Sequence, residues 1–507
     1  MNHHNPPTIY VASAGTGKTT TLLGKLTEAL ETTTPQNIVF TTFTNAGAQE
    51  IVSRILEKFP SWSEEDFRYF RTLHSLAYRN IPRKPMLHLR DMFEFARETG
   101  LPVSGAGTLA DGTLSQRMEL GDHYLYLDGL RRNRLWSFQQ AVESQEITEF
   151  SEQELIDFSN RYNEFRQRIN KYDFTDQLEI FHQNIDPWSP PITHLFVDEC
   201  QDLSTLQWKI IDKLHRKVWT SVYAGDDKQA IYGFSGGDTQ ALINLEGERI
   251  VLRESYRLPK QVLAYSESIA SNVKNKQPYT VTSNQREGSV DYVDNLYSLE
   301  EELKEGTWFL LVRNRKFMAT FEIQLNQMGF LYLSDSKNSL ITEEVLQVIE
   351  DWSQLIRGFS ISGEKAKVLY SKYLRGKSVA HGFKKQLLLV DDNESLDRNT
   401  LQSQFGLLKT DEWYDTLSFS EALREALMAL KEKGELGNKP RIRVATIHSV
   451  KGKEADNVVV LPDMSTLTHR SFQKEPDEEH RVFYVAVTRA KQKLYLHKPT
   501  EDKHYPL

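Results

Sequence analysis

The sequence predicts an α/β protein with doubly wound parallel sheets, and three observations lead to this fold class. Short apolar runs rich in β-branched and aromatic residues recur along the 507-residue chain. Most of them are followed by a segment with helical periodicity, and runs that are apolar on both faces are typical of strands buried between two layers of helices. Two long charged segments interrupt this alternation, so we expect mainly helical insertions in an α/β frame.

The expected strands are bounded by turn residues. They are residues 8–12, 37–42, 194–199, 221–226, 308–313, 443–448 and 457–462. The helical segment "TTTLLGKLTEAL" follows the first strand, and "NAGAQEIVSRILEKF" follows the second. The segments that lack such runs are residues 77–171 and 346–439, and these are the expected insertions.

Composition excludes several classes of protein. A single cysteine, Cys200, excludes a disulfide framework and indicates a reducing compartment. The opening "MNHHNPPTIY" has no apolar secretory segment, and the longest apolar runs are too short to cross a membrane. We therefore expect a cytoplasmic protein, in the host cytoplasm if it is virus-encoded, with no membrane partner. The net charge of −8 argues against coating duplex DNA by bulk charge, but leaves a local single-strand groove open.

The glycine-rich stretch "ASAGTGKTT" lies between the first expected strand and its helix. Gly15 and Gly17 allow backbone N–H groups to face phosphate oxygens, and Lys18 can reach the β- and γ-phosphates. The hydroxyl of Thr19 can ligate Mg²⁺. The stretch predicts nucleotide binding, which kinases and motors share; a turn that only joins a strand to a helix is the alternative.

Functional side chains follow two later strands. "HLFVDECQD" places Asp198 and Glu199 at a strand end, where the first can hold Mg²⁺ and the second can activate water. This pair favours hydrolysis over the chemistry of a small-molecule kinase. In "YAGDDKQAIYGFSGG", Gln229 is placed to sense a γ-phosphate. Tyr232 and Phe234 either stack on bases or belong to the core.

Eight stretches carry a resemblance to a known family. They are "TTFTNAGAQEI", "TLHSLA", "YDFTDQL", "DECQD", "GDDKQAIYGF", "SYRLP", "TIHSVKGKE" and "YVAVTRA". In sequence and order they resemble the motifs of superfamily 1A DNA helicases, the UvrD/Rep/PcrA family, over residues 10–490. The resemblance implies two RecA-like domains with two mainly helical insertions. It also implies an ATP-dependent 3′–5′ translocase and helicase, acting as a monomer on single-stranded DNA and on junctions with double-stranded DNA.

The resemblance further implies domain boundaries. Domain 1A is expected at 1–76 and 172–251, insertion 1B at 77–171, domain 2A at 252–345 and 440–507, and insertion 2B at 346–439. Arg489 lies far from Lys18 in the chain and on a different expected sheet. We therefore expect ATP in a cleft between the two domains, where an arginine finger can close on the γ-phosphate.

The site residues implied by the resemblance form three groups. Those implied in catalysis are Lys18, Glu199 as the base, Gln229 as the γ-phosphate sensor, Arg257 at the γ-phosphate and Arg489 as the arginine finger. Those implied in binding ATP and Mg²⁺ are Ala14, Gly15, Thr16, Gly17, Lys18, Thr19, Thr20, Tyr256 at the adenine and Glu454 at the sugar, with Thr19 and Asp198 at the metal. Those implied in contacting DNA are Phe43, Asn45, His74, Tyr232, Phe234 and His448.

Two basic stretches lie in the expected insertions. "RRNRLWSF" interleaves Arg131, Arg132 and Arg134 with two aromatic residues, and "SKYLRGKSVAHGFKKQ" clusters five lysines and arginines. Each stretch either contacts the DNA backbone or is a solvated face, and the sequence leaves both alternatives open.

The sequence leaves other questions of function open. Relatives carry an adenine-reading glutamine upstream of the glycine-rich stretch, whereas none of the ten residues before Val11 is a glutamine. The sequence therefore predicts a motor that is less strict about its nucleotide than its relatives, and comparable rates with GTP and ATP would support this prediction. One alternative function is a translocase that strips proteins from DNA or serves a separate nuclease. Another is a non-catalytic DNA-binding scaffold. The pathway and any protein partner stay unidentified.

Overall fold

The computed structural model describes residues 5–105, 118–144, 151–185, 191–336 and 338–507, which form two compact units. The first unit comprises Met1–Val290, Ile447–Lys453 and Met464–Leu494, and the second comprises Asp291–Thr446, Glu454–Asp463 and Tyr495–Leu507. The expected domain boundaries stay predictions. In the part of the chain that is described, no helix has the length and apolar character needed to span a membrane.

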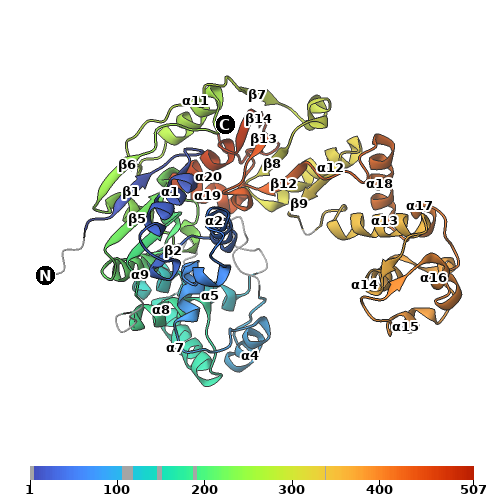
Figure 1. The fold of residues 1–507 in the computed structure, drawn as a ribbon, viewed down its shortest axis with the longest axis horizontal. Coiled ribbons are helices and arrows are strands. Elements are labelled where there is room, and N and C mark those ends of the chain that lie inside the picture. Colours follow the sequence, from blue (N-terminus) through green and yellow to red (C-terminus); the bar gives the residue numbers. More distant parts are fainter. Residues whose placement is uncertain (1–4, 106–117, 145–150, 186–190, 337) are drawn as a thin grey trace. The chain divides into compact units, whose positions relative to one another are not determined.

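The first unit contains a six-stranded sheet with the order β3–β2–β4–β5–β1–β6. Its strands are β1 (Thr8–Val11), β2 (Ile38–Thr41), β3 (Phe70–Arg71), β4 (His194–Val197), β5 (Thr220–Gly225) and β6 (Glu248–Val251). Of these strands, Figure 1 labels β2, β5, β1 and β6. All pairings are parallel, with Val11 opposite Gly225 and Val197 opposite Tyr223. The carboxyl ends of β1, β4 and β5 therefore meet at one edge, where ligands bind in open α/β sheets.

Helices cover both faces of this sheet. Successive residues of a strand point to opposite faces, and here both sets of side chains are buried against helices. Tyr10 and Phe40 enter a core with α1 and α2, whereas Ile9 and Val39 enter a second core with α3, α8 and α9. The helices of the unit are α1 (Lys18–Leu30), α2 (Asn45–Lys58), α3 (Leu73–Arg79), α4 (Leu89–Thr99), α5 (Leu120–Arg134), α6 (Phe138–Glu143), α7 (Glu152–Arg168), α8 (Phe174–Asn184), α9 (Thr205–His215), α10 (Thr239–Asn244), α11 (Lys260–Ser271), α19 (Thr466–Lys474) and α20 (Pro476–Val487). Between α3 and α8, the described residues form the helices α4–α7, which have their own core around Phe95.

A second six-stranded sheet has the order β7–β14–β13–β8–β12–β9. Its strands are β7 (Ser289–Val293), β8 (Trp308–Val312), β9 (Tyr332–Ser334), β12 (Ile442–Thr446), β13 (Ala455–Leu461) and β14 (Ala490–His497). The pairs β13–β8, β8–β12 and β12–β9 are parallel. Two parallel sheets with covering helices confirm the predicted fold class.

The second expected insertion is mainly helical as well. Its elements are α13 (Glu343–Ile356), α14 (Gly363–Val368), α15 (Phe383–Leu387), α16 (Arg398–Gln404), α17 (Trp413–Thr416) and α18 (Glu421–Lys433), with a short antiparallel ribbon of β10 (Ile361–Ser362) and β11 (Ser395–Leu396). Figure 1 shows α14–α17 grouped together, in orange. Between β8 and β9, the helix α12 (Met318–Met328) completes the unit.

Candidate functional site

The glycine-rich stretch forms the loop between β1 and α1. Gly15 and Gly17 have φ values of 73° and 76°, which glycine adopts without strain. A Cβ atom on Gly15 would lie 2.3 Å from the Cβ of Arg257, so a larger residue does not fit there. Of the other residues predicted to bind ATP from this loop, Ala14 and Thr16 are buried, whereas Thr19 and Thr20 are more accessible. The free N–H groups at the start of α1 favour a bound anion.

Lys18 is the first residue of α1 and pairs with both carboxylates that follow β4. Its Nζ lies 2.6 Å from Glu199 Oε2 and 3.4 Å from Asp198 Oδ1. Burial raises the pKa of Asp198. Burial also acts to raise the pKa of Glu199, but Lys18 and Lys451 outweigh it and lower that pKa to about 2. Glu199 is therefore ionised at neutral pH. Its backbone has a φ of 53°, a strained value for a residue other than glycine that is typical of functional sites.

Arg489 follows α20 and is 1% exposed. Its Nη2 donates to Gln229 Oε1 at 3.0 Å, and the Gln229 amide donates in turn to Asp226. Its remaining hydrogen bonds go to two backbone carbonyls and a hydroxyl, and no described carboxylate forms an ion pair with it. Burial and the nearby Arg257 lower the pKa of Arg489, although a guanidinium stays charged at neutral pH. A buried cation with only neutral partners favours an incoming anion.

Tyr256 and Arg257 lie against the same loop. The N–H of Tyr256 donates to the carbonyl oxygen of Gly15 at 2.9 Å, while the Tyr256 side chain stays 67% exposed. Arg257 Nη1 reaches the carbonyl oxygen of Thr488, the residue before Arg489, at 3.5 Å. The residues predicted for ATP that belong to the first unit thus lie on and around this loop. Glu454 is exposed and directly follows Lys453, whose carbonyl oxygen accepts from Arg489 Nη1 at 3.1 Å.

Lys451 was not singled out from the sequence, although it stands within "TIHSVKGKE". Its Nζ donates to the buried carboxylate of Asp202 and, at 2.6 Å, to the carbonyl oxygen of Gln229. The same ammonium lies 4.8 Å from the centre of the Tyr232 ring. Burial raises the pKa of Asp202 to about 6. Lys451 therefore connects the residue that contacts Arg489 to an aromatic cluster.

This aromatic cluster consists of Phe43, Tyr232, Phe234 and His448. Phe43 and Tyr232 stack with ring centres 4.6 Å apart, and Tyr232 lies 5.9 Å from Phe234. His448 lies 6.2 Å from Tyr232 and 5.8 Å from Phe234, but it is only 4% exposed. Asn45 is the exposed first residue of α2, two residues after Phe43. Four of the six residues predicted to contact DNA thus lie in one cluster of rings, in which Phe43, Tyr232 and Phe234 are partly exposed and His448 is buried.

His74 is paired instead with Phe174, the first residue of α8. Their ring centres are 6.2 Å apart, and the Phe174 side chain is 70% exposed. Burial lowers the pKa of His74. Phe174 was missed as a candidate even though its stretch, "YDFTDQL", was recognised, because one aromatic residue in a helical pattern is more often a core residue. Its exposure marks it as a second aromatic surface.

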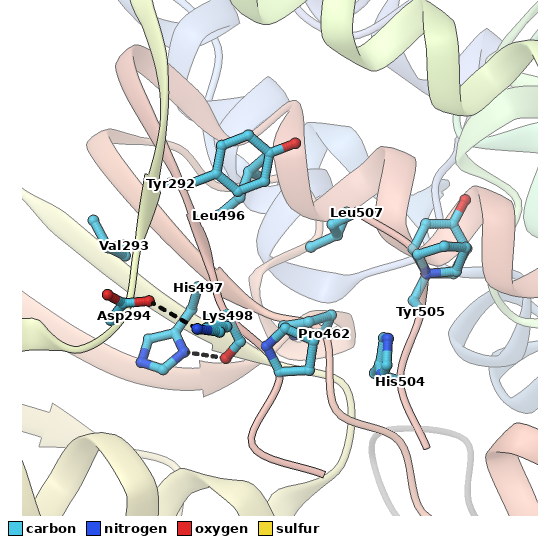
Figure 2. A pocket seen from close by; sticks show the side chains of 12 residues that line it. Tyr292, Val293, Asp294, Pro462, Leu496, His497, Lys498, His504, Tyr505 and Leu507 are labelled. Atoms are coloured by element: carbon cyan, nitrogen blue, oxygen red, sulfur yellow. Dashed lines mark hydrogen bonds and ion pairs between the residues drawn. The ribbon is translucent and has the colours of Figure 1, made fainter. Parts of the chain in front are cut away.

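A pocket of about 440 Å³ lies in the second unit (Figure 2). Figure 2 shows Tyr292 and Leu496 on one side of it and Tyr505 and Leu507 on the other. None of the predicted site residues lines this pocket. The pocket contains one ion pair, between Asp294 and Lys498, and both side chains of this pair are largely exposed. We therefore assign the pocket no function.

Comparisons with known proteins identify the family of the chain. The sequence model of the UvrD/REP helicase N-terminal domain matches residues 1–249, and that of the UvrD-like helicase C-terminal domain matches residues 389–500. A probable DNA helicase II homolog of Mycoplasma capricolum is 23% identical, with 97% of this chain and 82% of the relative covered. The ATP-dependent DNA helicase PcrA of Staphylococcus aureus is 22% identical, with 97% of this chain and 81% of the relative covered. The two matched domains together span more than two thirds of the sequence, and the chain belongs to the UvrD-like helicase family.

Proposed function

We propose that this protein is an ATP-dependent 3′–5′ single-stranded DNA translocase and DNA helicase. The observation that carries the proposal is the continuous contact from Arg489 through Gln229 and Lys451 to the ring of Tyr232. This chain of contacts supports a mechanical link between a phosphate site and a surface of stacking rings. Family membership supports the activity, since one relative is named an ATP-dependent DNA helicase.

In the proposed hydrolysis, bound phosphates compete for Lys18 and loosen its 2.6 Å contact with Glu199. Glu199 is then available to orient and deprotonate the attacking water, while Gln229 senses the γ-phosphate. Arg257 and Arg489 supply positive charge to the oxygens on which negative charge develops. We keep the expectation that ATP lies in a cleft between two RecA-like domains and that its closure drives translocation.

Magnesium fits the donors of this site. No group of three or more His, Cys, Asp or Glu side chains suited to a metal lies within the described ranges. Mg²⁺, however, usually takes only one or two protein carboxylates and completes its shell with water and substrate phosphates. Thr19, in the first turn of α1, and Asp198, 3.4 Å from Lys18, would hold the ion. When bound, Mg²⁺ would neutralise phosphate charge.

The exposed ring of Tyr256 is proposed to stack on the nucleobase. We expect Tyr256→Ala to raise KM for ATP about fivefold to 150-fold, because base–aromatic stacking contributes roughly 1–3 kcal/mol. The value of kcat should change little, since the base takes no part in the reaction, and Tyr256→Phe should behave like the unchanged protein. Steady-state ATP hydrolysis with saturating single-stranded DNA measures both constants. A KM that stays the same in the alanine variant would remove Tyr256 from the base site.

The single strand is proposed to bind over the aromatic cluster of Phe43, Tyr232, Phe234 and His448, with further contacts at Asn45, His74 and Phe174. Bases stack on such rings without regard to sequence, which suits a motor that must pass every base. Because His448 is buried, its contact requires the strand to enter between the rings. We further propose a monomer that acts in the cytoplasm on single strands and on junctions with duplex DNA; a protein partner stays unidentified.

Strand displacement on tailed duplexes tests the proposed function. With ATP and Mg²⁺, we expect unwinding of a duplex with a 3′ single-stranded tail and none of a duplex with a 5′ tail. ATP hydrolysis should rise on addition of single-stranded DNA. Unwinding from the 5′ tail would contradict the direction. Hydrolysis that ignores DNA would contradict the motor itself.

One observation favours a variant of this function. The alignment with the Mycoplasma capricolum relative extends over 606 positions, more than the 507 residues of this chain, so the relative contains segments that this chain lacks. A reduced chain is compatible with a translocase that strips proteins from DNA and unwinds poorly alone. Displacement of streptavidin from a biotinylated strand, measured beside unwinding, distinguishes the two activities.

A further inference from the structure

The three arginines near the end of α5 have different surroundings. Arg132 is 6% exposed and donates to the carboxylates of Asp173, Asp176 and Glu179 on or next to α8. Arg131 pairs with a carboxylate one turn earlier in α5, Asp128, at 2.9 Å. These two side chains therefore hold the helical insertion together and to α8.

Arg134 differs, because no described carboxylate forms an ion pair with it. Its Nη2 makes one long hydrogen bond, 3.4 Å, to the carbonyl oxygen of Gly233, and its buried Nε has no partner among the described residues. The guanidinium lies 5.4 Å from the centre of the Trp136 ring. A partly buried guanidinium with so few acceptors retains most of its capacity to bind an anion.

Arg134 lies at the loop that carries two rings of the aromatic cluster. The hydroxyl of Tyr126, also on α5, donates to the carbonyl oxygen of Phe234 at 3.2 Å. A Cβ atom on Gly236 would lie 2.9 Å from Asn133 Cβ and 3.9 Å from Arg134 Cγ. The last turns of α5 are thus packed directly on residues 233–236, the segment of the chain that carries Phe234 and follows Tyr232.

Local backbone geometry fixes this position. Leu135, which ends α5, has a φ of 56°, a left-handed conformation that costs a non-glycine residue roughly 1–2 kcal/mol. The turn directs the next N–H, that of Trp136, back to the carbonyl oxygen of Arg131 at 2.9 Å and brings the Trp136 ring under Arg134. Strained non-glycine residues of this kind are typical of functional sites.

We propose that Arg134 binds a backbone phosphate of the single strand whose bases stack on Tyr232 and Phe234. The first helical insertion then contributes directly to strand binding. A guanidinium suits this role because its planar fork matches phosphate oxygens. The inference rests on the proposed function, since it needs a single strand at the aromatic cluster.

The salt dependence of binding tests the proposal. The affinity for a fluorescent oligothymidine, without nucleotide, is measured between 50 and 200 mM NaCl for the unchanged protein and for Arg134→Gln. Loss of one phosphate contact lowers the slope of log affinity against log salt by about 0.7. The unchanged protein should therefore lose about 2.6-fold more affinity over this range than the variant. Arg134→Lys keeps the charge and should keep most of the slope.

Two control variants separate this contact from a structural role. Arg168→Gln removes the same charge from α7, where the exposed arginine pairs with Glu98, and should leave the slope unchanged. Tyr126→Phe removes the hydroxyl that holds the loop and should change affinity without changing the slope. If the unchanged protein binds the strand and Arg134→Gln retains its full slope, the inference is wrong and the proposed function stands. If the unchanged protein binds no strand, the proposed function fails first.

Discussion

Replacing Arg489 by alanine is expected to lower kcat for DNA-stimulated ATP hydrolysis by about 10³- to 10⁵-fold. The buried guanidinium, 3.0 Å from Gln229 and without a carboxylate partner in the described chain, is available to neutralise charge that develops on the γ-phosphate. Because this charge develops mainly in the transition state, the affinity for ATP should change far less than kcat. Steady-state hydrolysis with saturating single-stranded DNA measures kcat, and a fluorescent ATP analogue measures binding.

Two further variants sharpen this result. Arg489→Lys keeps a positive charge but loses the planar fork, and should recover only part of the activity. Gln229→Ala removes the partner of Arg489, so its effect and that of Arg489→Ala should be far from additive in the double variant. A kcat within tenfold of the unchanged protein in Arg489→Ala, with normal thermal stability, would exclude Arg489 as the arginine finger.

Replacing Lys18 by alanine is expected to lower kcat/KM for ATP by about 10²- to 10³-fold or more. The lysine is the one cation that pairs with both Asp198 and Glu199 among the described residues, and it is proposed to move onto the phosphates. Its loss removes phosphate binding and leaves two carboxylates facing the incoming anion. Binding of single-stranded DNA without nucleotide should be retained, because the aromatic cluster is untouched. Hydrolysis and strand binding are measured on the same preparation.

Lys25→Ala provides the matched control for this prediction. Lys25 lies on the same helix, α1, but forms an exposed ion pair with Glu28 on its surface. Exposed pairs contribute little, so this variant should hydrolyse ATP like the unchanged protein. If DNA-stimulated hydrolysis survives Lys18→Ala, the motor interpretation is wrong. If neither the unchanged protein nor either variant hydrolyses ATP, a DNA-binding scaffold is the better description.

The amino-acid sequence determined the fold class and, to within a few residues, the central strands. The expected strand at 457–462 is Ala455–Leu461, and the one at 8–12 is Thr8–Val11. These runs were readable because a strand buried on both faces must be apolar at nearly every position. The eight-residue β14 was not expected, since it opens with "AKQK" and its apolar part is only "LYLH". Polar residues at the start of a strand hide it from a pattern of apolar residues.

The tertiary structure decided which side chains meet. Arg131, Arg132 and Arg134 stand in one short stretch with the same local signals, yet one pairs within its helix, one is enclosed by carboxylates of another segment and one has no carboxylate partner in the described chain. Lys451 and Phe174 likewise became candidates only through contact or exposure. The physical reason is that helix and strand periodicity are local properties of the sequence. Burial and ion pairing depend instead on residues far apart in the chain, which only folding brings together.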